Sequence, residues 1–441
     1  MRALVREHLS FMVTSPRRTA GSAKAQRLAR PATKASTLAC VGVCGYLIGV
    51  ALPLTPAFDL PLVFLALLAT LAAVTGRQQR PLRRSHAVIA VVAFVAARLA
   101  SSLAAPHPPA RLQFLAPLLP ALLLFFVLSE WVQTRGHIAA ICVSLTVVGF
   151  VLATTLLTVS WLSDTADPDA WAQAVPSPML VVKNDISVVA VLAPLALAVA
   201  SLRPHRVVQL IVFGFFASLI AVIGVVQSRT ALVTTVVAII AYAALARGPR
   251  SIRRPRVLVA MLVGLVAVAF AVNALVGFGF AHKVMHDWQG SGRLALWVAA
   301  LAMFRDAPLL GHGPNSFVLH YRAHLDALQL PAWIQVDPRV TPWAHNLYLE
   351  LLAEQGVVGL VAFLALGAVG LSMVSRITRS PHQDLRCLGA AAGASLIAFL
   401  TAASFELSFI RAWVTIMLFT LLGLLTTLTR SARGSNTCEA P

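Results

Sequence analysis

Long apolar runs alternate with short polar segments along most of the chain. Twelve of these runs approach or exceed the length that an α-helix needs to cross a lipid bilayer. They lie near residues 36–55, 60–76, 86–105, 113–132, 138–162, 179–201, 207–226, 231–246, 257–277, 356–375, 387–404 and 410–429. We therefore predict an all-α polytopic membrane protein with about twelve transmembrane helices. An even number of helices places both termini on the same side of the membrane.

One long polar segment, residues 278–355, interrupts this pattern. We expect it to form a helical loop domain that carries the active site, between nine helices at 36–277 and three helices at 356–429. A basic, Ser/Ala-rich arm at 1–35 precedes the helices, and a short tail at 430–441 follows them. No A-x-A cleavage site follows the first apolar run, so the arm is expected to be retained near anionic lipid.

The distribution of charge predicts the orientation. The formal net charge is +19, yet only 12% of the residues are charged, against about 25% in soluble proteins. The positive charges form short clusters between apolar runs, without the pattern of a nucleic-acid-binding module, so nucleic acid is not an expected partner. Loops on the side of the N-terminal arm hold 25 Lys and Arg residues, whereas the opposite short loops hold only Arg111 and Arg229, with Arg411 at a helix entrance. By the positive-inside rule both termini are cytoplasmic. Residues 163–178 and 278–355 then face outward, which is the periplasm for a protein of a Gram-negative inner membrane.

Patterns for metal, nucleotide or cofactor binding are absent from the sequence. It contains no CxxC, HExxH, GxxxxGK[ST] or GxGxxG pattern. The five cysteines lie in predicted helices or in the tail and do not suggest a disulfide framework. His282/His286 and His320/His324 have the i,i+4 spacing of some zinc-binding helices, but exposed helix faces account for them as well. We expect no metal site and no cofactor.

The end of the polar segment contains a candidate general base. Thr341 can cap a helix and Pro342 suits the first helical position, so we expect His345 in the first helical turn. The positive end of the helix dipole would keep its imidazole neutral and able to accept a proton. The alternative is an interfacial histidine that is held by a neighbour. The helix then leads to Gly356, a plausible C′ residue, before the next membrane helix.

The same residues carry a family resemblance. His345 and Asn346, nine further residues, Gly356, two residues and Gly359 resemble the signature of the O-antigen ligases. These enzymes belong to the O-antigen ligase/polymerase superfamily of bacterial membrane glycosyltransferases. Ligases, polymerases and protein O-glycosylases of this superfamily share most of its motifs.

Three further segments are similar to the superfamily, so that the resemblance extends from about 180 to 375. The first is the turn at 227–230, which places Ser-Arg between two membrane helices. The second is Ser-Gly-Arg at 291–293, with Trp297 four residues after the arginine. The third is a P-L-L-G-x-G turn at 308–313, whose glycines suit tight turns.

The resemblance implies a reaction and roles for several residues. An O-antigen ligase transfers a preassembled glycan from undecaprenyl diphosphate to a sugar hydroxyl of lipid A-core, with inversion and without ATP. His345 would be the general base. Arg229 and Arg293 would bind the diphosphate, because a guanidinium can hold phosphate oxygens through forked hydrogen bonds. His312 and Asn346 would be further substrate contacts, although His312 fits a turn-stabilising role equally well.

Charged residues within or near the membrane helices are additional candidates. Arg98 lies inside the third predicted helix, and Lys183 and Asn184 lie at the outer end of the sixth. All three are candidate substrate-binding residues. Their structural alternatives are that Arg98 snorkels or pairs with an acid, and that Lys183 and Asp185 neutralise each other.

The sequence permits more than one role for the remaining acidic residues, and it permits two other functions. Glu350 either orients a partner side chain or faces water, and the turn from Glu406 to Arg411 suits a structural ion pair. An O-antigen polymerase would use the same chemistry on a different acceptor. A transporter for lipid-linked sugars, which performs no chemistry, would instead concentrate polar residues at the membrane midplane.

Overall fold

A computed structural model describes residues 34–51, 85–106, 112–132, 134–175, 177, 179–202, 205–246, 274, 292–337, 340–341 and 343–436. This part of the chain is mainly helical and contains no β-strand, as the sequence predicts. The predicted helices at 60–76 and 257–277 lie outside the described residues, apart from residue 274.

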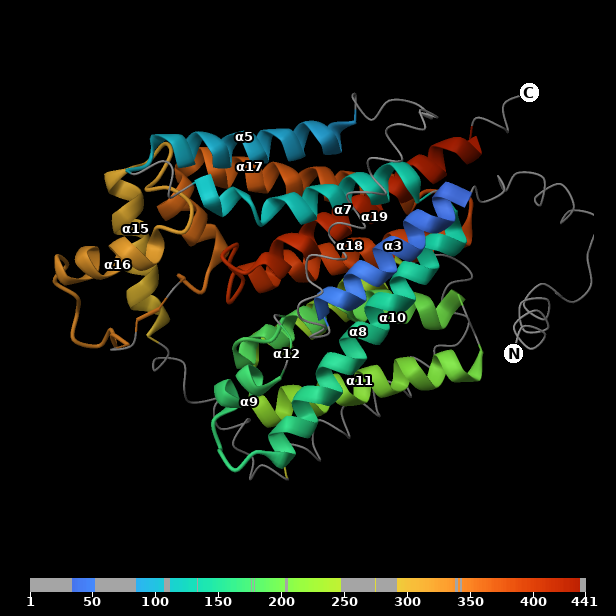
Figure 1. The fold of residues 1–441 in the computed structure, drawn as a ribbon, viewed down its shortest axis with the longest axis horizontal. Coiled ribbons are helices and arrows are strands. Elements are labelled where there is room, and N and C mark those ends of the chain that lie inside the picture. The colour runs from blue at the N-terminus through green and yellow to red at the C-terminus, as the bar shows by residue number, and fades with distance from the viewer. Residues whose placement is uncertain are drawn as a thin grey trace, which may run out of the picture.

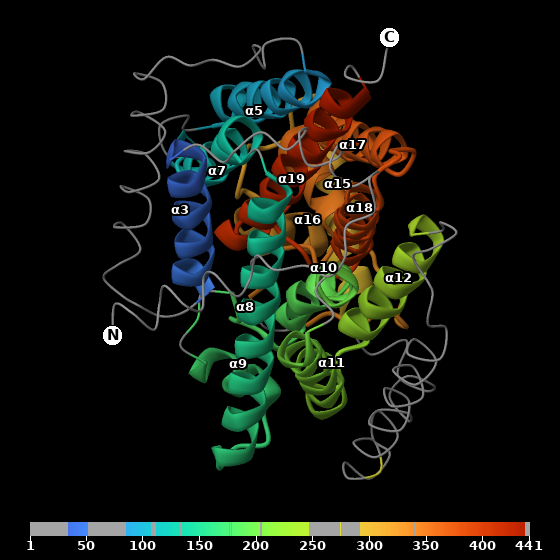
Figure 2. The ribbon, with the colours of Figure 1, turned by 90° about the vertical axis from the view of Figure 1, so that its right-hand side faces the viewer.

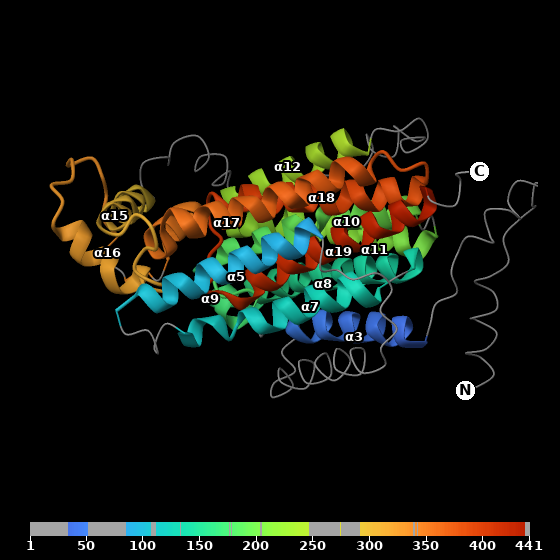
Figure 3. The same ribbon diagram turned by 90° about the horizontal axis from the view of Figure 1, so that it is seen from above.

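The long helices form one bundle, and two shorter helices project from one end of it (Figures 1 and 3). The bundle consists of α3 (Lys34–Ala51), α5 (His86–Ala104), α7 (Leu118–Trp131), α8 (Arg135–Leu162), α10 (Ser187–Leu202), α11 (Arg206–Val226), α12 (Arg229–Leu245), α17 (Leu347–Ile377), α18 (Gln383–Ala403) and α19 (Ala412–Asn436). The projecting helices are α15 (Arg293–Asp306) and α16 (Phe317–Asp326). Shorter elements are η2 (Gln113–Leu115), α9 (Pro168–Ala174) and η3 (Lys183–Ile186).

Eight helices of the described part are long and apolar enough to cross a membrane. They are His86–Ala104, Gln113–Trp131, Arg135–Leu162, Lys183–Leu202, Arg206–Val226, Leu347–Ile377, Gln383–Ala403 and Ala412–Arg433. Two apolar helices, Ser36–Ala51 and Arg229–Leu245, are shorter. Each of these ten helices overlaps a predicted span. The chain is therefore a multi-pass helical membrane protein, and the total of twelve stays a prediction.

Two groups of helices pack on either side of a central pair (Figures 1 and 2). On one side α17 contacts α5 and α19, and α19 also contacts α7, whereas α8 and α11 pair on the other side. Between them, α10 packs against α18, and α12 contacts both. Small residues allow close approach of helices, as is usual where lipid removes the hydrophobic drive for association. For example, Gly393 of α18 packs directly against the side chain of Val374 on α17.

Ion pairs mark the two ends of the bundle. At the end away from α15 and α16, Arg135 pairs with Asp384 at 3.9 Å and Arg430 pairs with Glu130 at 3.2 Å. These residues come from segments that the sequence assigns to the cytoplasmic side. At the other end, Lys183 pairs with Asp169 of α9 at 3.7 Å. Asp169 belongs to the segment 163–178, which the sequence assigns to the outer side.

Helix α17 is broken at Gly356, as the sequence indicates. Its φ of 64° and ψ of −166° belong to a region that is essentially restricted to glycine. The turn at 308–313 fills the break, because the amides of Val357 and Val358 donate to the carbonyls of Pro308 (2.9 Å) and Leu309 (3.3 Å). A Cβ at Gly356 would collide with the backbone of Leu309. The break therefore locks the projecting part onto the bundle.

Glu354 of α17 also links the projecting segment to the bundle through hydrogen bonds. Its carbonyl accepts from the amide of Gly313 at 2.8 Å and from the hydroxyl of Ser101 on α5 at 3.0 Å. Its carboxylate accepts from the amides of Asn315 at 2.9 Å and Phe317 at 3.0 Å. The start of α16 is thus capped by an acid from another helix, whereas Ser316 at the N-cap position makes no capping side-chain bond.

Candidate functional site

A polar cluster lies where the projecting segment meets the bundle, and its centre is the carboxylate of Glu406. Glu406 lies in the turn between α18 and α19, and its side chain is 0% exposed. Arg293 Nη2 lies 2.9 Å from Oε2, and the side-chain amide of Asn184 donates to the same oxygen at 3.1 Å. Nδ1 of His345 lies 3.1 Å from both carboxylate oxygens. Four segments that are distant in sequence therefore meet at one buried anion.

The expected position of His345 in a helical turn is wrong. Helix α17 begins at Leu347, and Asn346 is its N-cap, accepting from the amides of Tyr348 (3.1 Å) and Leu349 (3.2 Å). Asparagine is a strong N-cap residue, and it lies nearer to the apolar helical run than Thr341 does. His345 precedes the cap with a left-handed φ of 51°. The argument from the helix dipole therefore does not apply to its imidazole.

The contacts of His345 indicate which ring nitrogen carries hydrogen. The indole N–H of Trp343 lies 3.2 Å from Nδ1, on the nitrogen that also faces Glu406. The same nitrogen cannot accept from the indole and donate to the carboxylate. An ionised carboxylate is the stronger partner, and guanidinium groups compensate its charge. We therefore assign the hydrogen to Nδ1, which leaves Nε2 as the proton acceptor.

Arg293 and Arg229 each begin a helix at this end of the bundle. Arg293 opens α15 directly after Gly292, which has a left-handed φ of 60°. Arg229 opens α12, and the hydroxyl of Ser228, the N-cap before it, donates to Asn184 at 2.9 Å. Asn184 in turn donates to Glu406. The motifs around Arg229, Arg293 and His345 are thus connected by hydrogen bonds and ion pairs.

The suggested neutralisation of Lys183 by Asp185 is wrong. Lys183 pairs with Asp169 of α9, whereas Asp185 accepts from Nη1 of Arg411. The side chain of Asp185 also accepts from the amides of Val181 and Val182, so it turns away from its near neighbour Lys183. Local sequence spacing does not determine such pairs, because the partners lie on different elements.

Arg411 holds the turn that carries Glu406. Its Nη2 lies 3.8 Å from Oε1 of Glu406, so the expected structural ion pair is confirmed. Its guanidinium lies over the rings of Trp343 at 4.5 Å and Trp413 at 5.4 Å. The side chain of Arg411 is only 7% exposed, and its Nη2 also donates to the backbone carbonyl of Glu406. Arg411 therefore acts as a buried cationic anchor.

Arg98 neither snorkels nor lies in the Glu406 cluster. Its side chain is 3% exposed, and its charge lies near the carboxylates of Glu354 and Glu350. Within the part of the chain that the structure describes, its Nε and Nη1 atoms have no hydrogen-bond partner. Glu350 is also buried and accepts from the hydroxyl of Ser408 at 2.6 Å, so it does not face water.

The structure does not bring His312 to His345. His312 Nε2 lies 3.0 Å from the carbonyl of Met303, and its ring contacts those of His320 and His324. His324 Nε2 also lies 2.7 Å from Asp306. Among the described residues, no group of three or more His, Cys, Asp or Glu side chains has an arrangement that could hold a metal ion. His282 and His286 lie outside those residues.

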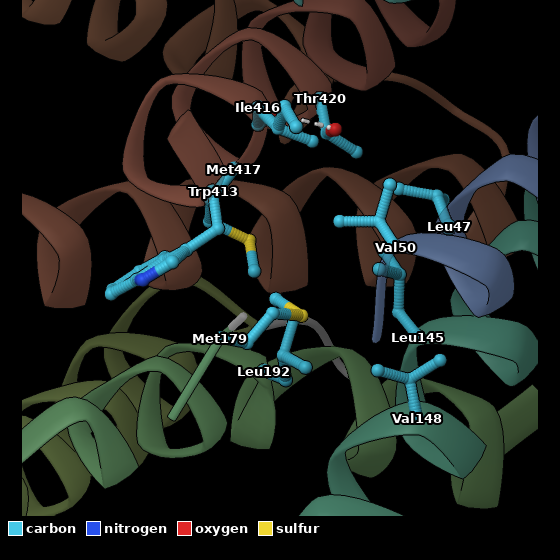
Figure 4. A pocket seen from close by; sticks show the side chains of 10 residues that line it. All are labelled: Leu47, Val50, Leu145, Val148, Met179, Leu192, Trp413, Ile416, Met417 and Thr420. Atoms are coloured by element: carbon cyan, nitrogen blue, oxygen red, sulfur yellow. Dashed lines mark hydrogen bonds between the residues drawn. The ribbon is translucent and has the colours of Figure 1, made fainter. Parts of the chain in front are cut away.

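A small pocket lies inside the bundle and has a different character (Figure 4). It is lined mainly by hydrocarbon and thioether groups such as those of Leu192, Met179 and Met417, with Trp413 at one side. Its one hydroxyl, that of Thr420, donates to the carbonyl of Ile416 at 2.7 Å. Apart from the indole N–H of Trp413, the lining offers no free polar group and no titratable side chain, unlike the Glu406 cluster.

These features define a multi-pass membrane protein with a buried polar cluster at the end of its helical bundle. Residues 214–364 match the family model described as O-antigen ligase. The resemblance is therefore confirmed for this segment, which carries the O-antigen ligase family motifs. No curated protein matches the chain.

The matched segment contains Arg229, Arg293 and His345, but it ends before Glu406. The sequence predicts for Glu406 only a structural ion pair with Arg411. The sequence does offer one signal for a larger role: Glu406 lies at the edge of an apolar helix, and charged residues at the edge of membrane helices are often functional. Its partners, however, come from three other segments, and sequence spacing does not relate them.

Proposed function

We propose that this protein transfers a preassembled glycan from undecaprenyl diphosphate to a sugar hydroxyl of lipid A-core. The observation that carries the proposal is the Glu406 cluster, which joins the His345 and Arg293 segments directly and the Arg229 turn through Ser228 and Asn184. A base beside cationic groups suits a reaction in which a hydroxyl is deprotonated and a diphosphate departs.

In the proposed reaction, Nε2 of His345 takes the proton from the acceptor hydroxyl. The hydroxyl oxygen forms a bond to the anomeric carbon of the donor as the bond from that carbon to the phosphate oxygen breaks. The electron pair leaves with undecaprenyl diphosphate, and the proton passes from His345 to water. One direct displacement inverts the configuration at the anomeric carbon. The diphosphate is already a good leaving group, so the reaction requires no ATP.

The arginines would act on the leaving group. Arg293 and Arg229 would bind the diphosphate and stabilise the charge that grows on it. Lys183, beside Asn184 and paired with Asp169 at 3.7 Å, stays a candidate for further phosphate contact. Asn346, whose side-chain oxygen caps α17, and His312, which contacts Met303, more naturally shape the site than touch substrate. We assign the same supporting role to Arg98, because it is buried beside Glu350 and Glu354.

We place the site at the periplasmic face of a Gram-negative inner membrane, with both termini in the cytoplasm. The supporting observation is that the cluster lies at the same end of the bundle as α15 and α16 (Figure 1), opposite the ion pairs of Arg135 with Asp384 and of Arg430 with Glu130. Residues 278–355 would then be the periplasmic loop domain, between transmembrane segments at 36–277 and 356–429, with a basic arm at 1–35 and a tail at 430–441.

An assay with purified full-length protein, undecaprenyl-diphosphate-linked glycan and lipid A-core tests the proposal. Transfer of glycan to lipid A-core is the expected result. Extension of the glycan on undecaprenyl diphosphate would instead identify a polymerase, which uses the same chemistry on another acceptor. Absence of both products, together with movement of the lipid-linked sugar across proteoliposome membranes, would favour the transporter and refute a transferase.

A further inference from the structure

We propose that Glu406 is the positioning residue for the general base His345, so that the two side chains act as a carboxylate–imidazole pair. This inference rests on the proposed function, because it assumes that His345 accepts a proton during transfer. Neither the motifs in the sequence nor the matched segment at 214–364 includes Glu406. The inference comes from the geometry of its carboxylate.

The contact between the two residues is direct. Nδ1 of His345 lies 3.1 Å from each carboxylate oxygen, within hydrogen-bonding distance. The carboxylate is fully buried, whereas the side chain of His345 is 21% exposed. A hydrogen bond from Nδ1 to a buried carboxylate holds the ring in one orientation and one tautomer. The opposite nitrogen, Nε2, then carries the lone pair that a base requires.

The carboxylate is itself held from several sides. Asn184 donates to Oε2 at 3.1 Å, and Arg411 lies 3.8 Å from Oε1. Arg411 also donates to the backbone carbonyl of Glu406 and pairs with the buried Asp185. These contacts keep the carboxylate in place independently of Arg293. If Arg293 moves from Glu406 to the donor diphosphate, His345 therefore keeps its partner.

The pair also has an energetic consequence for the proton transfer. When His345 accepts the proton, it becomes an imidazolium, and the adjacent negative charge stabilises that form. Other charged groups also affect the proton affinity of His345. Arg293 of α15 and Arg411 contact the same carboxylate, and Arg411 also pairs with Asp185 of η3. The neighbouring elements carry Lys183 of η3, which pairs with Asp169 of α9, Arg229 at the start of α12, and Glu350 of α17, which accepts from Ser408.

A first experiment measures the imidazole without any substrate. Diethylpyrocarbonate acylates neutral imidazole, so modification of His345 in the full-length protein is followed by mass spectrometry across the pH range in which histidine titrates. In Glu406→Gln, loss of the negative charge disfavours protonation, and we expect the midpoint to fall by about one pH unit or more. Glu406→Asp keeps the charge and should lie nearer to the original protein.

The matched control is Glu130→Gln, which removes a carboxylate from an ion pair at the opposite end of the bundle. Its midpoint should equal that of the original protein. An unchanged midpoint in Glu406→Gln would overturn the proposed pair. If Glu406→Gln does not fold, Glu406→Ala provides the comparison: its midpoint should be lower without acetate and should return toward that of the original protein when acetate is added. An unchanged midpoint in Glu406→Ala without acetate would likewise overturn the pair.

A second experiment uses single-turnover transfer from undecaprenyl-diphosphate-linked glycan to lipid A-core. Glu406→Gln should lower the transfer rate by about 10²-fold or more, in the range seen when a general base is impaired. In a His345→Ala background it should cause no further loss, because Glu406 acts through His345. A further loss in that background would refute the positioning role. If His345→Ala transfers normally, the proposed base fails instead, while the acylation experiment still decides whether the pair exists.

Discussion

The connection that Glu354 makes between α17 and α16 leads to a quantitative prediction about stability. Its carboxylate is buried and accepts from two backbone amides, those of Asn315 and Phe317. Glu354→Ala would remove both acceptors at a site where Phe317 is fully buried. Each buried amide left without a partner costs about 1–3 kcal/mol, so the loss should be roughly 2–6 kcal/mol. Arg98 would also lose one of its two neighbouring carboxyl groups.

The substitution Glu354→Gln should destabilise the protein less than Glu354→Ala does. Its single carbonyl oxygen can accept from one of the two amides, so about half of the loss should remain. The measurement is thermal unfolding of the detergent-purified protein, together with the rate of tryptic cleavage at Arg322 in α16. We expect cleavage to accelerate in the order original protein, Glu354→Gln, Glu354→Ala. Release of α16 should be visible in cleavage before the bundle unfolds.

The control is Glu130→Ala, which loses one ion pair with Arg430 at the other end of the bundle. It should leave cleavage at Arg322 unchanged, because it does not touch the projecting segment. If Glu354→Ala unfolds and is cleaved like the original protein, the carboxylate does not hold the start of α16, and the reasoning is refuted. Faster cleavage at Arg322 in Glu130→Ala as well would mean that the assay detects a loss of stability of the whole bundle and not the local release of α16.

Four further predictions concern the site and its topology. His345→Ala should lower kcat by about 10²–10⁴-fold while donor binding changes little; weak donor binding with a normal rate for bound donor would make His345 a donor ligand. Arg229→Ala and Arg293→Ala should weaken donor binding as well as the rate, and the corresponding lysine variants should recover only part of both, because lysine lacks the fork. Full recovery by lysine would argue against a bidentate phosphate contact. Gly356→Ala should reduce thermal stability by more than about 1 kcal/mol, because its φ of 64° and the adjacent backbone of Leu309 both exclude a side chain, and an unchanged melting temperature would contradict this reading. A cysteine at Gln335 should react with a membrane-impermeant thiol reagent in cells whose outer membrane is permeabilised; labelling only after lysis of the inner membrane would reverse the proposed orientation.

Much of the fold follows from local sequence properties. Whether a segment is apolar and long enough to span a bilayer depends on its own residues, so the predicted runs in the described part all correspond to helices. The break at Gly356 is local for the same reason, since few other residues adopt its backbone conformation. The motif residues His345, Arg229 and Arg293 were identified from short patterns and a family resemblance. Those patterns did not indicate how the three residues are connected.

The start of α17 shows where local reasoning becomes ambiguous. Thr341 and Asn346 are both suitable N-cap residues, so the sequence permits more than one helix start. In the structure, Trp297 donates to the carbonyl of Ala344 at 3.1 Å, and the amide of Thr341 donates to the hydroxyl of Tyr321 at 3.0 Å. These contacts hold the segment before Asn346 in a non-helical path. Because of these tertiary contacts, Asn346 is the N-cap of α17, and His345 lies before the helix.

The charge pairs were decided entirely by the tertiary structure. Lys183 and Asp185 are near neighbours in sequence, yet they pair with Asp169 and Arg411. Glu406 meets His345 and Arg293 from positions 61 and 113 residues away. An electrostatic interaction depends on distance in space and on burial, and neither is encoded in the spacing along a chain that folds into many helices. The sequence by itself thus indicated a multi-pass membrane protein with a segment similar to the O-antigen ligases. Only the tertiary structure showed that the buried carboxylate of Glu406 contacts His345, Arg293 and Asn184.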